Sequence, residues 1–205
     1  MISLKEIEEF AIKSHADVNQ KYGDKPYEVH LRMVVKWGER FWFMIPDKDR
    51  EMVMGALWLH DGIEDCRLTL NDIKKATQSD TLAEIVYAVT NEKGRTREER
   101  ANDKYYKGIR KTEYAVFTKL CDRLGNVENS AREKSSMLKK YKKENDNFIY
   151  KLVKHEWYEF NQHVIRILIG HKRFLKYRIR KSGYAPMIRR LKDIFDSVGI
   201  AFYGN

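Results

Sequence analysis

The 205-residue chain has the length of one domain, or of one domain with an appendage. Hydrophobic residues make up 42% and charged residues 34%, a balance that predicts a folded core and excludes disordered and collagen-like chains. Only 3 prolines and 11 glycines interrupt it, which favours long helices. Two cysteines cannot form a disulfide framework, no apolar run is long enough to span a membrane, and the first residues do not resemble a signal peptide. We expect a cytoplasmic, mostly helical protein.

The formal net charge of +10 is unevenly distributed along the chain. Residues 132–192 carry 18 lysines and arginines against 5 acidic residues, whereas the remainder carries 22 basic and 25 acidic residues. A solvated helical face explains any single lysine of this segment as well as a binding role does. Taken as a whole, the segment favours an anionic partner, either nucleotide phosphates or nucleic acid.

Apolar residues at helical spacing, capping residues and turn residues divide the chain into predicted helices, and strand signals are weak throughout. Residues 91–102 are polar and predict a loop that enters a helix. Trp37, Trp42 and Trp58 are expected in the core. In chain order, helices are expected from Ser3 to before Tyr22, after Tyr27, over 52–59, after Thr69, and over 82–89, 114–129, 136–154, 157–169 and 186–195.

The residues most suggestive of chemistry are His60 and Asp61, followed by Glu64 and Asp65. On one helix they would present four ionisable groups to the same side of an otherwise apolar segment. Burying such groups without partners is costly, and a divalent cation is the simplest partner. A second imidazole and a second carboxylate could come from His30 and Asp122. Such a mixed set suits Mn²⁺, Fe²⁺ or Zn²⁺ better than Ca²⁺.

A His-Asp dipeptide is weak evidence by itself. The alternative is structural: His60 would hydrogen-bond inside a core, while Glu64 and Asp65 would cap the next turn. The ordered occurrence of histidine, His-Asp, Glu-Asp and a later aspartate, all within predicted helices, favours the metal site over this alternative.

Three segments resemble the HD-domain hydrolases of the RelA/SpoT type, and most of all the small alarmone hydrolases. They read KYGDKPYEVH at 21–30, after His15, then ALWLHDGIED at 56–65 and KLCDRLGN at 119–126, with AVT at 88–90 as a further landmark. The resemblance covers about residues 3–153. It implies an all-α HD-domain bundle over 1–153. Beyond about residue 153 the chain shows no correspondence to the family, and we expect residues 154–205 to form a basic helical extension packed on the same domain. The resemblance also implies one Mn²⁺ and removal of the 3′-diphosphate from (p)ppGpp or (p)ppApp.

The resemblance also assigns residues to roles. It implies that Glu64 and Asp65 orient or deprotonate the attacking water. Asn126 matches a position beside the ribose and the metal, Asn129 a position at the base edge, and Tyr141 an aromatic hydroxyl near the phosphates. The implied metal ligands are His30, His60, Asp61 and Asp122.

Charge and departures from the family pattern complete the expected substrate site. Lys139 and Lys143 lie one helical turn apart, and by charge alone we expect them to hold the diphosphates. Gln20 stands where many relatives have an arginine that stacks on guanine. Lys21 is then the remaining cation expected on that side of the base-binding pocket. Leu31 replaces a proline. Because Asn129 also replaces a common threonine, the choice between guanine and adenine stays open.

Two other functions compete with alarmone hydrolysis. The chain could be another HD phosphohydrolase, acting on nucleoside monophosphates or on the phosphate of NADPH. It could also be a catalytically weak module that binds RNA or nucleotides through its basic segment. Glu64 and Asp65 argue against pure binding, which needs no general base. The sequence leaves the physiological metal and the oligomeric state open.

Overall fold

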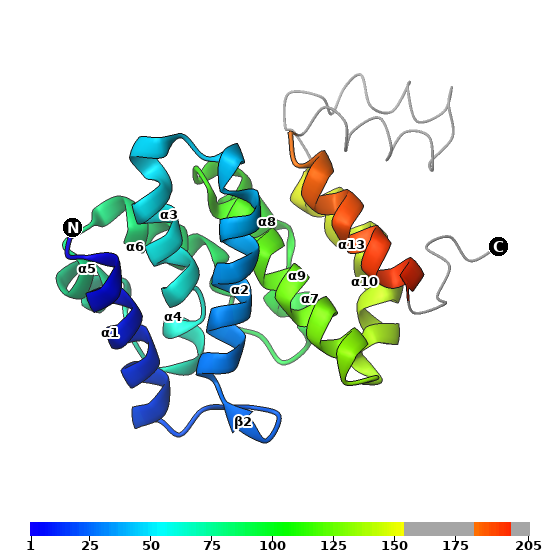
Figure 1. Ribbon diagram of the computed structural model, residues 1–205, viewed down its shortest axis with the longest axis horizontal. Helices are drawn as coiled ribbons and strands as arrows, with labels where there is room; N and C mark the ends of the chain where they lie inside the picture. Colours follow the sequence, from blue (N-terminus) through cyan, green and yellow to red (C-terminus); the bar gives the residue numbers. More distant parts are fainter. Residues whose placement is uncertain (154–182, 198–205) are drawn as a thin grey trace. The chain divides into compact units, whose positions relative to one another are not determined.

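The computed structural model describes residues 1–153 and 183–197 (Figure 1). Contacts divide the chain into two compact units, Met1–Gly125 and Asn126–Asn205. Nearly all regular structure in the described residues is helical, which confirms the predicted all-α class. The predicted domain boundary after residue 153 stays a prediction, because residues 154–182 and 198–205 lie outside the described part.

The first unit is a set of helices with one small hairpin near its start. The hairpin pairs two antiparallel two-residue strands through a turn in which Gly23 has a φ of +63°, a value that favours glycine. The elements in chain order are α1 (Leu4–Asp17), β1 (Lys21–Tyr22), β2 (Lys25–Pro26), α2 (Glu28–Phe41), η1 (Trp42–Met44), α3 (Asp47–Leu59), α4 (Gly62–Asp65), α5 (Leu70–Thr77), α6 (Asp80–Val89), α7 (Arg97–Arg100), α8 (Asp103–Lys111) and the first part of α9 (Ala115–Arg132).

Local capping fixes where several of these helices begin. The Ser3 hydroxyl accepts from the Glu6 backbone amide, and the Glu6 carboxylate accepts from the Ser3 amide, so α1 begins with a capping box. Thr69 and Asp72 form the same box at α5. These bonds satisfy amide groups that the first turn of a helix leaves without partners. Short-range sequence therefore sets these helix starts.

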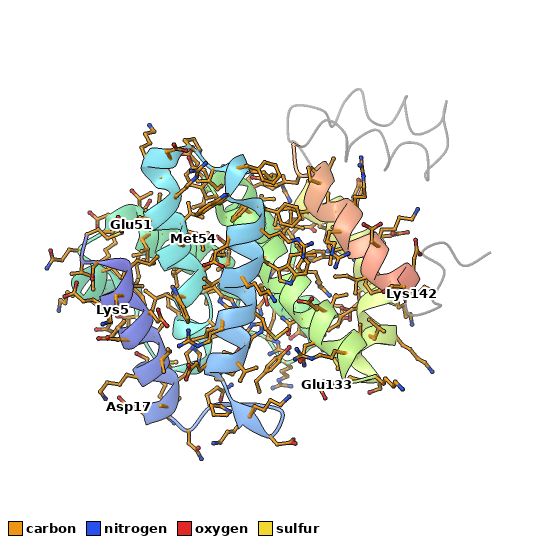
Figure 2. All side chains as sticks on the ribbon, in the orientation of Figure 1. Lys5, Asp17, Glu51, Met54, Glu133 and Lys142 are labelled. Atoms are coloured by element: carbon orange, nitrogen blue, oxygen red, sulfur yellow. The ribbon has the colours of Figure 1, made fainter. Side chains whose placement is uncertain are left out.

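Helix α3 packs against both α1 and α2, and Figure 1 shows it between them. Along α3, Glu51 is exposed, whereas Met54 is buried toward Gly38 of α2 (Figure 2). A Cβ added to Gly38 would overlap the Leu57 side chain. The two helices can approach this closely because position 38 carries no side chain. This contact brings the residues near the start of α2 close to the end of α3.

One expectation about the first unit needs correction. Trp37 and Trp58 are buried as predicted, but Trp42 is 51% exposed. Trp42 lies in η1, at the corner between α2 and α3, where the Arg50 guanidinium packs 5.2 Å from its ring centre. A cation over its face thus replaces the expected core packing.

The second unit contains the end of α9, then α10 (Met137–Leu152) and α13 (Ala185–Ser197) among its described residues. Both α10 and α13 bury apolar faces, and Lys139 and Lys143 lie on the exposed part of α10. The predicted helix at 157–169 lies outside the described residues. In the described ranges, no helix has the length and apolar character needed to cross a bilayer.

Candidate metal centre

His60 lies at a break between two helices. Helix α3 ends at Leu59 and α4 begins at Gly62, so the continuous helix expected through His60 and Asp61 is in fact interrupted there. The His60 Nδ1 lies 2.9 Å from the Leu57 carbonyl oxygen, which in a continuous helix would accept from the Asp61 amide. If Nδ1 donates to that carbonyl, the neutral imidazole keeps a lone pair on Nε2, the form that binds a metal ion.

The second imidazole comes from the first turn of α2. His30 is 1% exposed, and its Nε2 lies 3.2 Å from Nε2 of His60. Tyr22 of the hairpin stacks on the His30 ring at 4.8 Å between ring centres, and Tyr27 meets it edge-on at 5.3 Å. Aromatic packing therefore orients this ring, whose Nδ1 is buried without a hydrogen-bond partner among the described residues.

Asp122 of α9 completes a group that could hold a metal ion. Its Oδ1 lies 3.5 Å from His30 Nε2 and 3.8 Å from His60 Nε2, and the three ligand atoms lie within 4.8 Å of one another. Metal–nitrogen bonds of about 2.1 Å place neighbouring ligand atoms about 3.0 Å apart in octahedral geometry and about 3.4 Å apart in tetrahedral geometry. The separation between the two Nε2 atoms falls between these values, and the two separations from Asp122 Oδ1 are about 0.1 and 0.4 Å longer than the tetrahedral value. The three residues could therefore hold a divalent cation.

Asp61 lies directly beside this group. Its Oδ2 is 2.7 Å from His60 Nε2 and 3.4 Å from His30 Nε2, and it accepts a 2.6 Å hydrogen bond from the Tyr27 hydroxyl. Burial alone would raise the pKa of Asp61, but the neighbouring His60 and His30 hold it well below its usual range. All four predicted ligands thus converge, with three of them in the group that fits an ion.

The electrostatics of the centre favour positive charge. Burial opposes protonation of His30, yet its bonds to Asp122 and Asp61 raise its pKa to about 9. The pKa of His60 is raised as well, against the effect of burial, by Asp61 and Asp122. The two buried carboxylates carry negative charge, which protons on the histidines or a divalent cation could compensate.

Glu64 and Asp65 differ in their surroundings. Glu64 is exposed, and its two carboxylate oxygens accept from the backbone amide and the side-chain amide of Asn91, at 2.6 and 3.0 Å. Asp65 is half-buried, and burial together with Asp61 raises its pKa to about 6, although hydrogen bonds from Tyr27 and Gln20 act in the opposite direction. Of the two, Asp65 is better suited to accept a proton near neutral pH.

Sequence reasoning missed two side chains that contact the ligands. Tyr27 was part of the resembling segment without a role of its own, yet its hydroxyl lies between Asp61 and Asp65. Burial and these carboxylates raise its pKa, so the hydroxyl stays protonated and donates. The second is Lys119, whose Nζ lies 3.0 Å from Asp122 Oδ2. A tyrosine just before a helix and a lysine at i−3 from an aspartate were the available signals.

The remaining predicted substrate residues lie in the hairpin, on α9 and on α10. Lys21 is exposed in β1, and Asn126 follows Asp122 by one turn on α9. The Asn129 side-chain oxygen accepts from Arg132 at 2.8 Å. In the second unit, Tyr141 is half-buried on α10, and Lys139 and Lys143 are exposed there. Their assignment to a substrate site stays a prediction.

No protein-family model matches the chain, and no curated protein matches it significantly. The centre is therefore characterised by its own geometry. The chain is a mostly helical protein with a buried His30/His60/Asp122 group that could bind a metal ion. Imidazole with carboxylate is a donor set that Mn²⁺, Fe²⁺ and Zn²⁺ all accept.

Proposed function

We propose that this protein is a divalent-metal-dependent hydrolase that removes the 3′-diphosphate from an alarmone nucleotide, (p)ppGpp or (p)ppApp. The observation that carries the proposal is that His30 of α2, His60 after α3 and Asp122 of α9 come together as a group that could hold one cation. Asp61 lies beside them, and the four residues follow one another along the sequence in the same order as in the RelA/SpoT-type hydrolases. The resemblance of the three sequence segments supplies the substrate class.

In this proposal His30, His60, Asp61 and Asp122 hold the cation, and Mn²⁺ is the expected metal. A bound divalent ion would lower the pKa of a water molecule and stabilise negative charge on phosphoryl oxygens. Binding requires both imidazoles to be unprotonated, so the cation takes over the charge that the two carboxylates otherwise draw from protons.

Asp65 is the proposed proton acceptor. Its half-buried carboxylate lies next to Tyr27 and is not one of the proposed metal ligands. It can therefore take a proton from water without any ligand dissociating from the cation. The Tyr27 hydroxyl, which donates its one proton to Asp61, also lies beside the Asp65 carboxylate. Glu64, fastened by Asn91, is the proposed partner that orients the water.

The substrate brings several negative charges, and the cations expected to meet them are Lys21, Lys139 and Lys143. Asn126 and Asn129 are proposed to contact the ribose and the base edge, and Tyr141 the phosphates. Opposite charges near the surface raise the local substrate concentration and lower KM, an effect that salt weakens.

A metal-supplemented substrate screen tests this function. The full-length protein is incubated with Mn²⁺ and ppGpp, pppGpp, ppApp, NADPH or deoxynucleotides, and the products are identified. We expect pyrophosphate and a 5′-diphosphate nucleoside from ppGpp or ppApp, loss of turnover with a chelator and recovery with added Mn²⁺. Asp65→Asn should lose about 10²–10⁴-fold in turnover, with the exposed Glu51→Gln as the matched control.

Other outcomes would assign another function. Release of inorganic phosphate from a nucleoside monophosphate or NADPH, without alarmone turnover, would replace the proposed substrate class. RNA binding that survives chelation, with no turnover of any nucleotide, would favour a binding module and contradict hydrolysis.

A further inference from the structure

Lys119 is a largely buried lysine next to the metal centre. Only 16% of its side chain is exposed, and its Nζ lies 3.0 Å from Asp122 Oδ2, one helical turn along α9. The ammonium group forms a salt bridge with Asp122 and a hydrogen bond with Tyr105, and these two partners offset the cost of burying it. Its charge balances part of the negative charge of the two carboxylates, and its position on Asp122 constrains how that carboxylate can bind an ion.

Tyr105 holds Lys119 in this position. The Tyr105 hydroxyl donates to the carbonyl oxygen of Val89 at 2.9 Å, and its oxygen accepts a hydrogen bond from Lys119. Because the hydroxyl proton is used on Val89, the oxygen can act only as an acceptor toward the ammonium group. The end of α6, α8 and α9 thus combine to fix one nitrogen atom.

The two oxygens of Asp122 face different partners. Oδ1 is the atom that lies 3.5 and 3.8 Å from the two histidine Nε2 atoms, whereas Oδ2 is the atom that contacts Lys119. A carboxylate can bind a divalent ion through one oxygen or through both. We propose that Lys119 is a positioning residue, which engages Oδ2 and so makes Asp122 a one-oxygen ligand.

This inference rests on the metal site of the proposed function. Catalytic metal sites keep a position for water or substrate beside their protein ligands. If Asp122 used both oxygens, it would occupy a further position on the ion. Lys119 prevents this and thereby preserves a place for exchangeable water. The competing view is that Lys119 only contributes an ion pair to the stability of α9, and then its removal would leave the metal's water count unchanged.

The test counts exchangeable waters on Mn²⁺ in the full-length protein, by the broadening of its electron paramagnetic resonance lines in ¹⁷O-enriched water. Lys119→Met keeps the length of the side chain and removes the charge. We expect this variant, at saturating protein, to hold one water fewer than the wild type, because Oδ2 becomes free to bind. Lys119→Arg should restore the wild-type count. Lys111→Met removes an exposed lysine of α8 and should change nothing.

The outcomes separate this inference from the proposed function. An unchanged water count in Lys119→Met, in a wild type that binds Mn²⁺ and hydrolyses its substrate, overturns the inference alone. A wild type that binds no Mn²⁺ overturns both. If Lys119→Met does not fold by circular dichroism, Tyr105→Phe takes its place. That variant loosens Lys119 without removing it, so a smaller loss of water supports the inference and an unchanged count overturns it.

Discussion

The candidate metal centre of the first unit and the lysine-rich surface of α10 both concentrate charge, but they do so under opposite conditions. At the centre, Asp61, Asp122 and Lys119 are largely buried, and each meets an oppositely charged or hydrogen-bonding atom at 2.6 to 3.5 Å. On α10, Lys139 and Lys143 face solvent. Where water is scarce, every charge needs a partner at a defined place, whereas a solvated charge acts mainly through its sign.

The largest expected effect follows from removing a ligand atom at the centre. Asn in place of His60 can keep a donor for the Leu57 carbonyl but has no counterpart of Nε2. We therefore expect His60→Asn to fold and to lose more than about 100-fold in Mn²⁺ affinity, measured by calorimetry. The exposed Glu51→Gln is the control. Wild-type affinity in His60→Asn would mean that this nitrogen is not a ligand.

Asp65 comes next in expected effect. Asp65→Asn should keep the metal and lose about 10²–10⁴-fold in kcat, as removal of a general base does. Glu64→Gln should lose less, because both Glu64 oxygens already accept hydrogen bonds from Asn91. Steady-state kinetics on the substrate found in the screen measure both. Near wild-type rates for the two variants would remove these residues from the mechanism.

The close approach of α2 and α3 should matter for stability. Gly38→Ala introduces a Cβ that overlaps Leu57, so we expect a loss of about 1–3 kcal/mol in the free energy of unfolding, measured with urea. Gly108→Ala in α8 meets nothing within 4 Å, and alanine favours a helix by up to about 1 kcal/mol. It should leave stability equal or higher. Equal losses of stability in both variants would show that the close contact between α2 and α3 at Gly38 does not explain the effect of Gly38→Ala.

The smallest effect is expected on the exposed surface. Neutralising Lys139 and Lys143 together removes two solvated charges, which should raise KM less than about tenfold and make KM less sensitive to salt. Lys111→Met is the matched single-charge control. If KM and its salt dependence do not change, these two lysines only form a solvated helix face and do not bind the substrate.

Much of the fold could be predicted because its signals are local. Ser3 with Glu6, and Thr69 with Asp72, specify helix starts through bonds three residues apart. Apolar spacing over about four turns predicts α9, since burial of one face requires that period. Trp42 shows the limit of this reasoning. Whether an aromatic residue at a corner is covered depends on neighbours that are distant in sequence.

The sequence by itself determined the helical class, the helix starts and the residue types of the centre, because propensity, capping and periodicity act within a few residues. The tertiary structure decided which atoms meet. The break after Leu59, the Tyr27 hydroxyl on Asp61, the hold of Asn91 on Glu64 and the contact of Lys119 with Asp122 Oδ2 are all set by packing. Metal binding depends on separations of a few tenths of an ångström, and helix spacing along a chain does not define distances between helices.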